Sequence, residues 1–423
     1  MLQVGFIRDH KEEVISRLSK RIDDPEKIVN DILSLDISRR DTQTQLDNIS
    51  SELNIISKEI GILFKSGQSK KATVLKQKTQ DLKEQKSVLT ELLNNTTTNL
   101  NNLLYKTPNL PHSLVPKGNS DKDNEEVFRS GKNPDLNDDA LPHWDLAKKF
   151  DIIDFELGNK ITGAGFPVYK GKGARLQRAL INYFLDKNTK AGYDEIQVPH
   201  LVNEASGLGT GQLPDKEGQM YYVQADDLYL IPTGEVPATN IFRGVIFKSN
   251  ELPRKLTTYT PCFRREAGSY GAHVRGLNRL HQFDKVEILR VEHPSKSYKA
   301  LESMVNHVKE ILNELKLPYR ILRLCSGDLG FTSALTYDFE VYSAAQKRWL
   351  EVSSVSNFET FQSNRLKLRF KNSDGKSQLA HTLNGSALAL PRILAGILEN
   401  YQTNTGIEIP EVLIPYTGFE SIN

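Results

Sequence analysis

Residues 263–287 read FRREAGSYGAHVRGLNRLHQFDKVE, two runs typical of β-strands on either side of a glycine-rich loop. Residues two apart in a strand share a face, so we expect Arg264 and Glu266 to point the same way. A guanidinium can fork onto a carboxylate and a phosphate, and a glutamate can accept a hydrogen bond from a base amino group. The stretch therefore suits a pocket that holds a nucleotide together with an amino acid.

On the returning run, Phe283, Lys285 and Glu287 share a face, and a hairpin would bring them beside Arg264 and Glu266. The ring of Phe283 offers a surface on which an adenine can stack. Other interpretations stay open. A cross-strand ion pair on a solvated face also places an arginine and a glutamate two residues apart, and Phe283 can pack in a core.

The whole stretch resembles the second signature motif of class II aminoacyl-tRNA synthetases, in the version carried by bacterial-type seryl-tRNA synthetases. Further segments resemble motifs of this family in the same order. Residues 231–237 (IPTGEVP) resemble its serine-binding segment, and residues 209–214 (GTGQLP) the segment ahead of that one. Residues 351–354 (EVSS) resemble its ATP-binding segment, and residues 381–392 its motif 3. An ordered set of motifs is more specific than any single one. With an N-terminal helical pattern as well, the resemblance covers nearly the whole chain.

Length and composition disfavour several other classes of protein. The chain has 423 residues, enough for two or more units with cores of their own. Its 55 Lys and Arg nearly balance its 53 Asp and Glu, so a nucleic-acid surface would have to be a local patch. Cys262 and Cys325 form no C-x-x-C pair, which disfavours a disulfide framework or a cysteine zinc site. Because a signal-type start and a membrane-length apolar run are lacking, we expect a cytoplasmic protein without a membrane or DNA partner.

Two apolar patterns near the N-terminus predict an antiparallel helical hairpin, or coiled-coil arm. The first set alternates spacings of three and four, and its members are Leu46, Ile49, Leu53, Ile56, Ile60 and Leu63. Residues 66–69 (SGQS) supply a turn. The second, less regular set can pack back on the first, and its members are Val74, Leu75, Leu82, Val88, Leu89, Leu92, Leu93, Leu100, Leu103 and Leu104.

The tip of this arm is its basic part. Residues 60–80 contain no acidic residue but include Lys65, Lys70, Lys71, Lys76 and Lys78. These lysines could simply solubilise the end of a helix. In seryl-tRNA synthetases such an arm grips tRNA, and the resemblance favours this role for the five lysines.

The rest of the chain divides at a polar, proline-containing passage. We expect a tRNA-binding domain at residues 1–105, a linker at 106–134 and a catalytic domain at 135–423. The last part shows no regular strand–helix alternation and no G-x-G-x-x-G opening, which disfavours a Rossmann fold. The resemblance implies an α+β class II domain with a central antiparallel sheet flanked by helices.

The resemblance also assigns the ATP site. Arg264 is expected to bridge the serine carboxylate and the α-phosphate, Glu266 to contact the adenine amino group and Phe283 to stack on the ring; Arg265 belongs to the same segment. Pro391 suits the first turn of a helix, so we expect Arg392 at a helix N-terminus, where anions are favoured. The family places this arginine at the γ-phosphate, although a surface arginine remains an alternative. Arg264 and Arg392 are the expected catalytic residues.

The resemblance also implies a metal ion, bound by residues of the ATP-binding segment Glu351, Val352, Ser353 and Ser354. Glu351 and Ser354 offer hard oxygen ligands for a Mg²⁺ that bridges ATP phosphates, the role that the family gives them. Residues three apart do not share a strand face, so their convergence requires a bend. A solvated glutamate and a strand-edge serine are the alternative.

For the amino acid, Thr233 and Glu235 are expected on one strand face, and the resemblance adds Gly234, Glu287 and Ser386. These residues offer hydrogen-bond partners for an ammonium group and for a side-chain hydroxyl. Alanine has no hydroxyl, so its binding would leave buried polar groups of the site unpaired, which disfavours it. Polar core residues satisfied by their neighbours are the alternative. Gly234 stands where relatives often carry alanine, and we expect that difference to matter little.

Two details remain open. Ala272 and His273 replace an Arg-Asp pair common in bacterial relatives, and Arg265 replaces a usual serine, so the contacts of this loop with tRNA are unassigned. His381 is interpreted as a hydrogen-bonded structural residue, with a general base as the alternative.

Taken together, the resemblance implies a homodimeric serine–tRNA ligase. It would form seryl-adenylate from serine, ATP and Mg²⁺ and load tRNA(Ser), and in this family also tRNA(Sec). Dimerisation follows from motif 1, here residues 192–203. The alternatives are a ligase that loads a small amino acid onto a carrier protein, which the long arm disfavours, and a non-catalytic RNA-binding paralogue.

Overall fold

The computed structural model describes residues 1–136, 139–215, 218–266 and 274–423. Ala272 and His273 lie outside these ranges. The chain divides into two compact units, residues 2–108 and residues 109–423, the second of which includes Met1.

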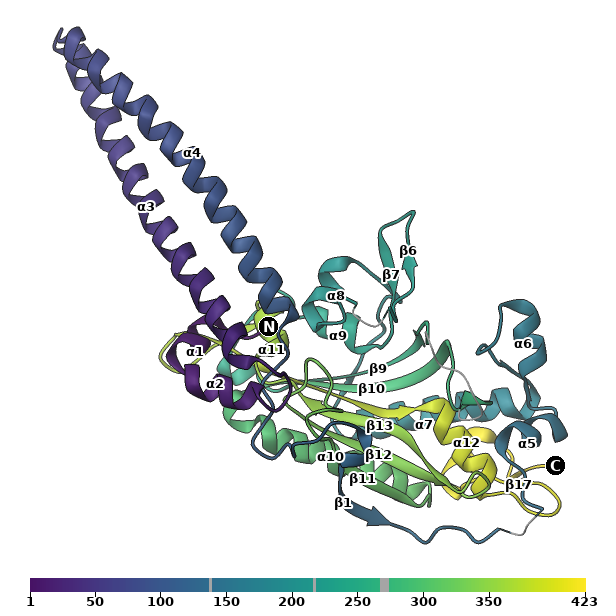
Figure 1. Cartoon of the computed structure of the whole chain (residues 1–423). Helices are drawn as coiled ribbons and strands as arrows, with labels where there is room; N and C mark the ends of the chain where they lie inside the picture. Colours follow the sequence, from purple (N-terminus) through teal and green to yellow (C-terminus); the bar gives the residue numbers. More distant parts are fainter. Residues whose placement is uncertain (137–138, 216–217, 267–273) are drawn as a thin grey trace. The chain divides into compact units, whose positions relative to one another are not determined.

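Helices make up the N-terminal unit (Figure 1): α1 Val4–Asp9, α2 Lys11–Leu18, α3 Pro25–Lys65 and α4 Ser69–Lys106. The side chain of Asp24 caps α3 by accepting a hydrogen bond from the backbone N–H of Lys27, and Pro25 suits the first turn. At 1.5 Å per residue, the 41 residues of α3 extend about 60 Å. The predicted helical hairpin and its turn are confirmed.

The seam between α3 and α4 follows the expected pattern on α3 and in part on α4. Leu46 and Ile56 of α3 are buried, as predicted. On α4 the prediction is wrong for three residues, because Val74, Val88 and Leu92 are exposed. Leu82, Leu100 and Leu104 are buried, as predicted, and the small Ala72 and polar Thr96 occupy further buried positions of α4.

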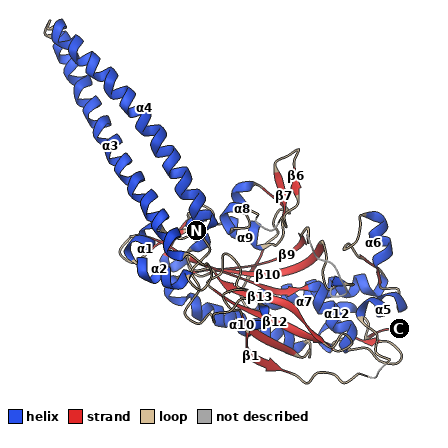
Figure 2. Ribbon diagram, in the orientation of Figure 1, coloured by secondary structure: helices blue, strands red, loops and turns tan. Residues whose placement is uncertain are grey.

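The second unit is built on a sheet of eight strands, which confirms the predicted α+β architecture (Figure 2). In spatial order the strands are β1 Glu125–Ser130, β11 Tyr319–Arg323, β12 Leu335–Ser343, β13 Arg348–Asn357, β16 His381–Ala389, β10 Gln282–Glu292, β9 Arg254–Phe263 and β4 Asp194–Glu195. Neighbouring strands run antiparallel except for β4 and β9, which are parallel.

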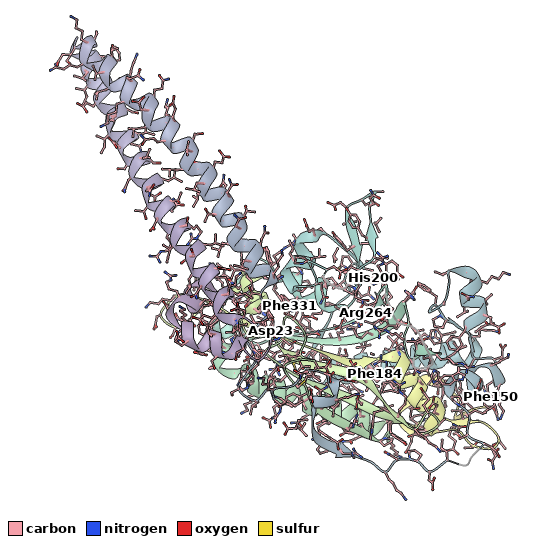
Figure 3. All side chains as sticks on the ribbon, viewed as in Figure 1. Asp23, Phe150, Phe184, His200, Arg264 and Phe331 are labelled. Carbon is pink, nitrogen blue, oxygen red and sulfur yellow. The ribbon has the colours of Figure 1, made fainter. Side chains whose placement is uncertain are left out.

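One hydrophobic core joins the sheet to helices α7 Gly171–Lys190, α10 Ser297–Glu314 and α12 Leu390–Asn400. Val286 and Ile288 of β10 are fully buried in it, together with Phe184 of α7 (Figure 3). Because side chains alternate along a strand, Phe283 and Lys285 lie on the opposite face of β10. Both line a cavity on that side.

Shorter elements complete the second unit. Before the sheet hairpin they are α5 His143–Lys149, β2 Ile153–Asp154, α6 Phe155–Ile161, β3 Val168–Tyr169, β5 Leu201–Val202, α8 Glu204–Thr210, β6 Tyr222–Val223, β7 Leu228–Leu230, α9 Glu235–Asn240 and β8 Ile246–Lys248. After it they are α11 Phe361–Leu366, β14 Arg369–Lys371, β15 Ser377–Leu379, β17 Ile407–Glu408, α13 Ile414–Thr417 and β18 Ser421–Ile422. Among the described residues, no helix combines the length and the apolar character needed to cross a bilayer.

Candidate active site

A cavity of about 460 Å³ gathers most of the predicted site residues. Those that line it are Thr233, Glu235, Arg264, Glu266, Phe283, Glu351, Val352, Ser353, Ser354, Ser386 and Arg392. Gly234, Arg265 and Glu287 do not line it. Segments far apart in sequence therefore meet in one site.

Arg264 lies just past the end of β9 (Figure 3) and next to the ring of Phe283 of β10. Its Nε donates to the carbonyl of Pro232 at 3.2 Å, and its guanidinium carbon lies 5.3 Å from the centroid of the Phe283 ring. The expectation that Arg264 and Glu266 share a strand face is wrong, because the strand ends at Phe263 and Glu266 has a φ of +46°. The regular strand alternation does not extend to these two residues, but both line the cavity.

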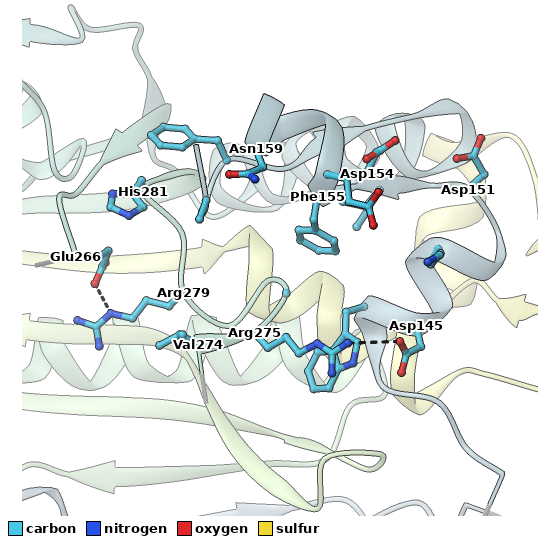
Figure 4. A pocket seen from close by; sticks show the side chains of 18 residues that line it. Asp145, Asp151, Asp154, Phe155, Asn159, Glu266, Val274, Arg275, Arg279 and His281 are labelled. Carbon is cyan, nitrogen blue, oxygen red and sulfur yellow. Dashed lines mark hydrogen bonds and ion pairs between the residues drawn. The ribbon is translucent and has the colours of Figure 1, made fainter. Parts of the chain in front are cut away.

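The carboxylate of Glu266 forms an ion pair with Arg279 (Figure 4). Arg279 also lines the cavity, but nothing in its loop sequence indicated a role. The side chain of Arg265 is exposed, and its backbone N–H donates to the carbonyl of Gln219 at 2.9 Å. Gln219 also accepts from the backbone N–H of Glu266, at 3.1 Å to its Oε1, so it holds this turn in place.

A buried network forms the floor of the cavity. The Thr233 hydroxyl donates to Glu287, with 2.9 Å from its Oγ1 to each carboxylate oxygen, and accepts from Lys285 Nζ at 2.8 Å. Lys285 also pairs with Glu287 Oε1 at 3.0 Å, and the backbone N–H of Glu235 donates to Glu287 Oε2 at 2.9 Å. Glu287 is therefore engaged beneath Thr233. Lys285, which the alternation of β10 had placed on this face, is a site residue that the motif comparison missed.

Thr233 and Glu235 do not share a strand face, contrary to expectation. Thr233 lies in a bend before the helix, and Glu235 is the first residue of helix α9. The reason is local, because Gly234 adopts a right-handed helical conformation and starts the helix. Both side chains reach the cavity all the same.

Glu235 is a buried carboxyl group that lines the cavity. Burial raises its pKa to about 7, and the neighbouring Glu287 contributes to the rise. Gln362 Nε2 donates to Glu235 Oε1 at 2.6 Å, which favours the charged form. A cation in the cavity would favour the carboxylate further.

Gly234 is packed more tightly than the sequence suggested. A Cβ at this position would lie 2.8 Å from Glu287 Oε2 and 2.8 Å from Thr260 Oγ1. Both are closer than real Cβ contacts, and Glu287 is held by the network described above. We therefore expect a methyl group here to disturb the floor of the cavity.

The segment Glu351 to Ser354 contains the irregularity that its spacing required. The register between β12 and β13 shifts so that Glu351 lies opposite Glu340 while Ser353 lies opposite Phe339, which leaves Val352 as an extra residue. Such a bulge turns the side chains on either side of it toward one ligand. Glu351 and Ser354 both line the cavity.

These oxygen donors fit a Mg²⁺ held largely by phosphates. Glu351 supplies a carboxylate and Ser354 a hydroxyl, both hard ligands. Among the described residues, no cluster of three or more His, Cys, Asp or Glu could form a metal cage. Opposite Ser354 stands Asp338, whose pKa is raised by burial and by the nearby Glu351. The residues fit the kind of Mg²⁺ site in which substrate phosphates complete the coordination.

Arg392 lies in the first turn of α12, next to Pro391, as predicted. Its Nε donates to the carbonyl of Asn278 at 2.9 Å, and its Nη1 donates to the carbonyl of Glu351 at 3.0 Å. The guanidinium is thus fixed between the end of the hairpin loop and β13. The helix N-terminus and the guanidinium together favour an anion there.

The remaining polar residues have structural partners. Ser386 faces Glu287 across the β10–β16 ladder, and its carbonyl accepts from Ser353 Oγ at 2.5 Å. His381 Nδ1 lies 2.8 Å from Ser297 Oγ, and burial lowers the pKa of His381 to about 4. His381 does not line the cavity, which supports its interpretation as a structural histidine.

The five tip lysines are all exposed, but two of them have partners within the arm. Lys78 Nζ lies 2.7 Å from Glu52 Oε1, and Lys76 Nζ lies 4.8 Å from the centroid of the Phe64 ring. Lys65, Lys70 and Lys71 surround the turn itself.

Comparison with known proteins agrees with this architecture. Residues 1–111 match the family model for the seryl-tRNA synthetase N-terminal domain, and residues 221–401 match the class II tRNA synthetase core domain (G, H, P, S and T). The serine–tRNA ligase of Salinibacter ruber is 48% identical over 100% of this chain and 99% of its own, and that of Thermotoga maritima is 45% identical over 100% of both. The crystal structure of the seryl-tRNA synthetase from Pyrococcus horikoshii complexed with ATP is similar, with a TM-score of 0.92, 32% identity and coverage of 100% of this chain and 99% of that chain. The chain therefore belongs to the seryl-tRNA synthetase family of class II aminoacyl-tRNA synthetases.

Proposed function

We propose that this protein is a serine–tRNA ligase, which activates L-serine with ATP to seryl-adenylate and transfers the seryl group to the 3′ end of tRNA(Ser), and by family resemblance of tRNA(Sec). One observation carries the proposal. A single cavity holds Arg264, Arg392 and the buried carboxyl of Glu235, which suit two anionic groups and one ammonium group. The full-length similarity to serine–tRNA ligases supports the same activity.

In the first step, an oxygen of the serine carboxylate attacks the α-phosphorus of ATP, and the bond to pyrophosphate breaks. Arg264 contacts both the carboxylate and the α-phosphate, which holds the two anions in line, while Phe283 stacks on the adenine and Glu266 contacts its amino group. Arg392 binds the γ-phosphate at the N-terminus of α12. No covalent bond to the protein is needed.

When bound, a Mg²⁺ ion would neutralise charge on the phosphates. Glu351 and Ser354 would hold it, and the bulge at Val352 would allow both side chains to face one ion. Burial and the nearby Glu351 raise the pKa of Asp338, opposite Ser354, which favours a neutral carboxyl group beside this segment.

The serine site lies on the floor of the cavity. Glu235 pairs with the ammonium group, and the hydroxyls of Thr233 and Ser386 recognise the polar ends of the amino acid. Glu287 acts on the serine through Thr233 and the backbone of Glu235, both of which it holds. Threonine is excluded by lack of room for a further methyl group.

The other parts of the proposal concern assembly. Residues 1–105 bind tRNA through the tip of the α3–α4 arm, and residues 106–134 connect them to the catalytic domain at 135–423, contributing strand β1 to its sheet. The protein works in the cytoplasm. It forms a homodimer through residues 192–203, which include the short edge strand β4. An exposed strand edge is a ready place for a second copy to pair.

The decisive experiment is amino-acid-dependent exchange of pyrophosphate into ATP with each of the twenty amino acids, followed by tRNA charging. We expect exchange with serine alone and seryl transfer to tRNA(Ser). Exchange without tRNA charging would favour the carrier-protein ligase. A folded protein with no exchange would favour the non-catalytic paralogue and contradict the proposal.

A further inference from the structure

A second cavity, of about 670 Å³, lies between helices α5 and α6 and the end of the hairpin loop (Figure 4). It shares Glu266 and Arg279 with the first cavity. At its base, Arg275 lies 3.9 Å from Asp145 and 4.9 Å from the centroid of the Trp144 ring. Helix α5 and the end of the loop are therefore in direct contact beside the proposed ATP site.

Behind this contact is a fully buried pair, His143 of α5 and Glu399 of α12. His143 Nδ1 lies 2.7 Å from Glu399 Oε1, and His143 Nε2 accepts from the backbone N–H of Leu277 at 2.8 Å. Because Nε2 accepts, the ring is neutral and its proton sits on Nδ1, where it is donated to Glu399. The loop approaches so closely that a Cβ on Gly276 would lie 2.3 Å from His143 Nε2.

Gln346 extends this pair toward the first cavity. Its Nε2 donates to Glu399 Oε1 at 2.8 Å, and its Oε1 accepts from the side-chain amide of Asn278 at 2.9 Å. The carbonyl of Asn278 in turn accepts from Arg392 Nε at 2.9 Å. Glu399 and Arg392 are seven residues apart on α12 and so lie on one face of it. Glu399 is therefore connected to Arg392 in two ways. Both residues belong to helix α12, and the hydrogen bonds of Gln346 and Asn278 join them through the loop.

We propose that His143 and Glu399 are positioning residues for ATP activation, which hold the end of the hairpin loop against α12 and thereby fix the guanidinium of Arg392. The inference rests on the proposed function, because it uses the γ-phosphate role of Arg392. Neither residue lines the first cavity, so neither touches substrate. Their effect is transmitted through Leu277, Asn278 and Gln346. The hydrogen bonds of these residues restrict the position of the Arg392 guanidinium.

The test compares full-length His143→Gln with wild type in serine-dependent pyrophosphate exchange. Displacing a positioned group costs activity even when the change is remote, so we expect the KM for ATP to rise by about tenfold with the KM for serine unchanged. Gln346→Ala is a milder second variant, because it removes the link between Glu399 and Asn278 but leaves the hydrogen bonds of His143 to Glu399 and Leu277 in place. The control is His307→Gln, which removes another buried histidine, one whose Nε2 lies 2.7 Å from Asn188 Oδ1. It should lower the Tm without changing the ATP parameters.

A second measurement separates positioning from general destabilisation. Affinity for α,β-methylene-ATP with Mg²⁺ is measured by isothermal titration in the wild-type and Arg392→Ala backgrounds. We expect His143→Gln to weaken binding in the first and to add little in the second, because it acts through Arg392. Wild-type ATP parameters in folded His143→Gln, equal rises for ATP and serine, or additive losses with Arg392→Ala would overturn the inference. Absence of exchange in the wild-type protein would instead overturn the proposed function.

Discussion

The hydroxyl of Thr233 donates to the carboxylate of Glu287, with 2.9 Å from Oγ1 to each carboxylate oxygen. The same hydroxyl accepts from Lys285 Nζ at 2.8 Å, so its proton has a fixed direction. A hydroxyl group held in this way has one defined orientation toward a ligand. Glu287 thus orients the Thr233 hydroxyl on the floor of the cavity, although Glu287 itself does not line the cavity.

Replacement of Glu287 should therefore damage serine use and stability together. Glu287→Ala leaves Lys285 buried without its partner, which should lower the free energy of unfolding by about 3–5 kcal/mol. Serine KM should rise by about tenfold or more, while ATP KM changes little. Isothermal titration with non-hydrolysable seryl-adenylate and alanyl-adenylate mimics tests specificity. Equal loss for both mimics would show that Glu287 does not serve hydroxyl recognition.

The pKa of Glu235 predicts a pH dependence for serine binding. Burial raises this pKa to about 7, so the carboxyl is protonated below that pH and ionised above it. The ammonium group of serine needs the carboxylate. The KM for serine should rise as pH falls below 7, by about tenfold for each unit well below the pKa. Exchange assays between pH 5.5 and 8 measure this, and Glu235→Gln should abolish the dependence. A KM for serine that stays flat across this range in the wild-type protein would rule out the assignment.

Gly234→Ala tests how closely the floor is packed. The added Cβ would meet Glu287 Oε2 and Thr260 Oγ1 at 2.8 Å each, and overpacking of this kind costs about 1–3 kcal/mol. We expect a lower Tm and a raised serine KM. At Gly330 the nearest atom to an added Cβ is 3.5 Å away, so Gly330→Ala is the matched control. If both variants behave alike, the contacts at Gly234 carry no functional weight.

Motif similarity located the cavity well, but it could not supply the local backbone. Arg264, Thr233 and Glu235 reach the cavity although none lies on the strand face assigned to it, because turns and a short helix end the ladders there. Periodicity describes regular elements, and binding residues stand where regular elements stop. The need for a bend between Glu351 and Ser354 was evident from their spacing, whereas the place of the bulge depends on pairing with β12.

In the coiled-coil arm, by contrast, the elements are regular, and the apolar repeat predicts one helix better than the other. Its first helix was predictable because Leu46 and Ile56 follow a regular seam. On α4 the apolar residues Val74 and Val88 misled the prediction, since Ala72 takes a buried position that a search for large apolar side chains overlooks.

Lys285 and Arg279 of the cavity were missed for another reason. The resemblance assigns their partners, Glu287 and Glu266, to substrates, and the sequence does not show which ion pairs form within the protein.

The two arginines of the cavity should be indispensable for adenylate formation. Arg264→Ala and Arg392→Ala each remove a positioned cation at a place where phosphate charge develops, so serine-dependent exchange should fall by about 10²-fold or more. The exposed Arg265 supplies a contrast within the same segment, and Arg265→Ala should lose much less. Near-normal exchange in either folded cavity variant would contradict the site assignment.

The tip of the arm should affect tRNA charging but not adenylate formation. Lys65, Lys70 and Lys71 flank the turn, and changing all three to Gln should raise the KM for tRNA while serine-dependent exchange stays at the wild-type rate. For each lysine–phosphate ion pair that the substitutions remove, the slope of log affinity against log salt should become shallower by about 0.9. Lys78→Gln is the internal comparison, because Lys78 pairs with Glu52 at 2.7 Å and its net charge toward a polyanion is smaller. Its salt slope should change less than that produced by any one of the three turn lysines. If the triple variant charges tRNA(Ser) with an unchanged KM and salt slope, these lysines do not contact tRNA, and the arm must bind it elsewhere or not at all.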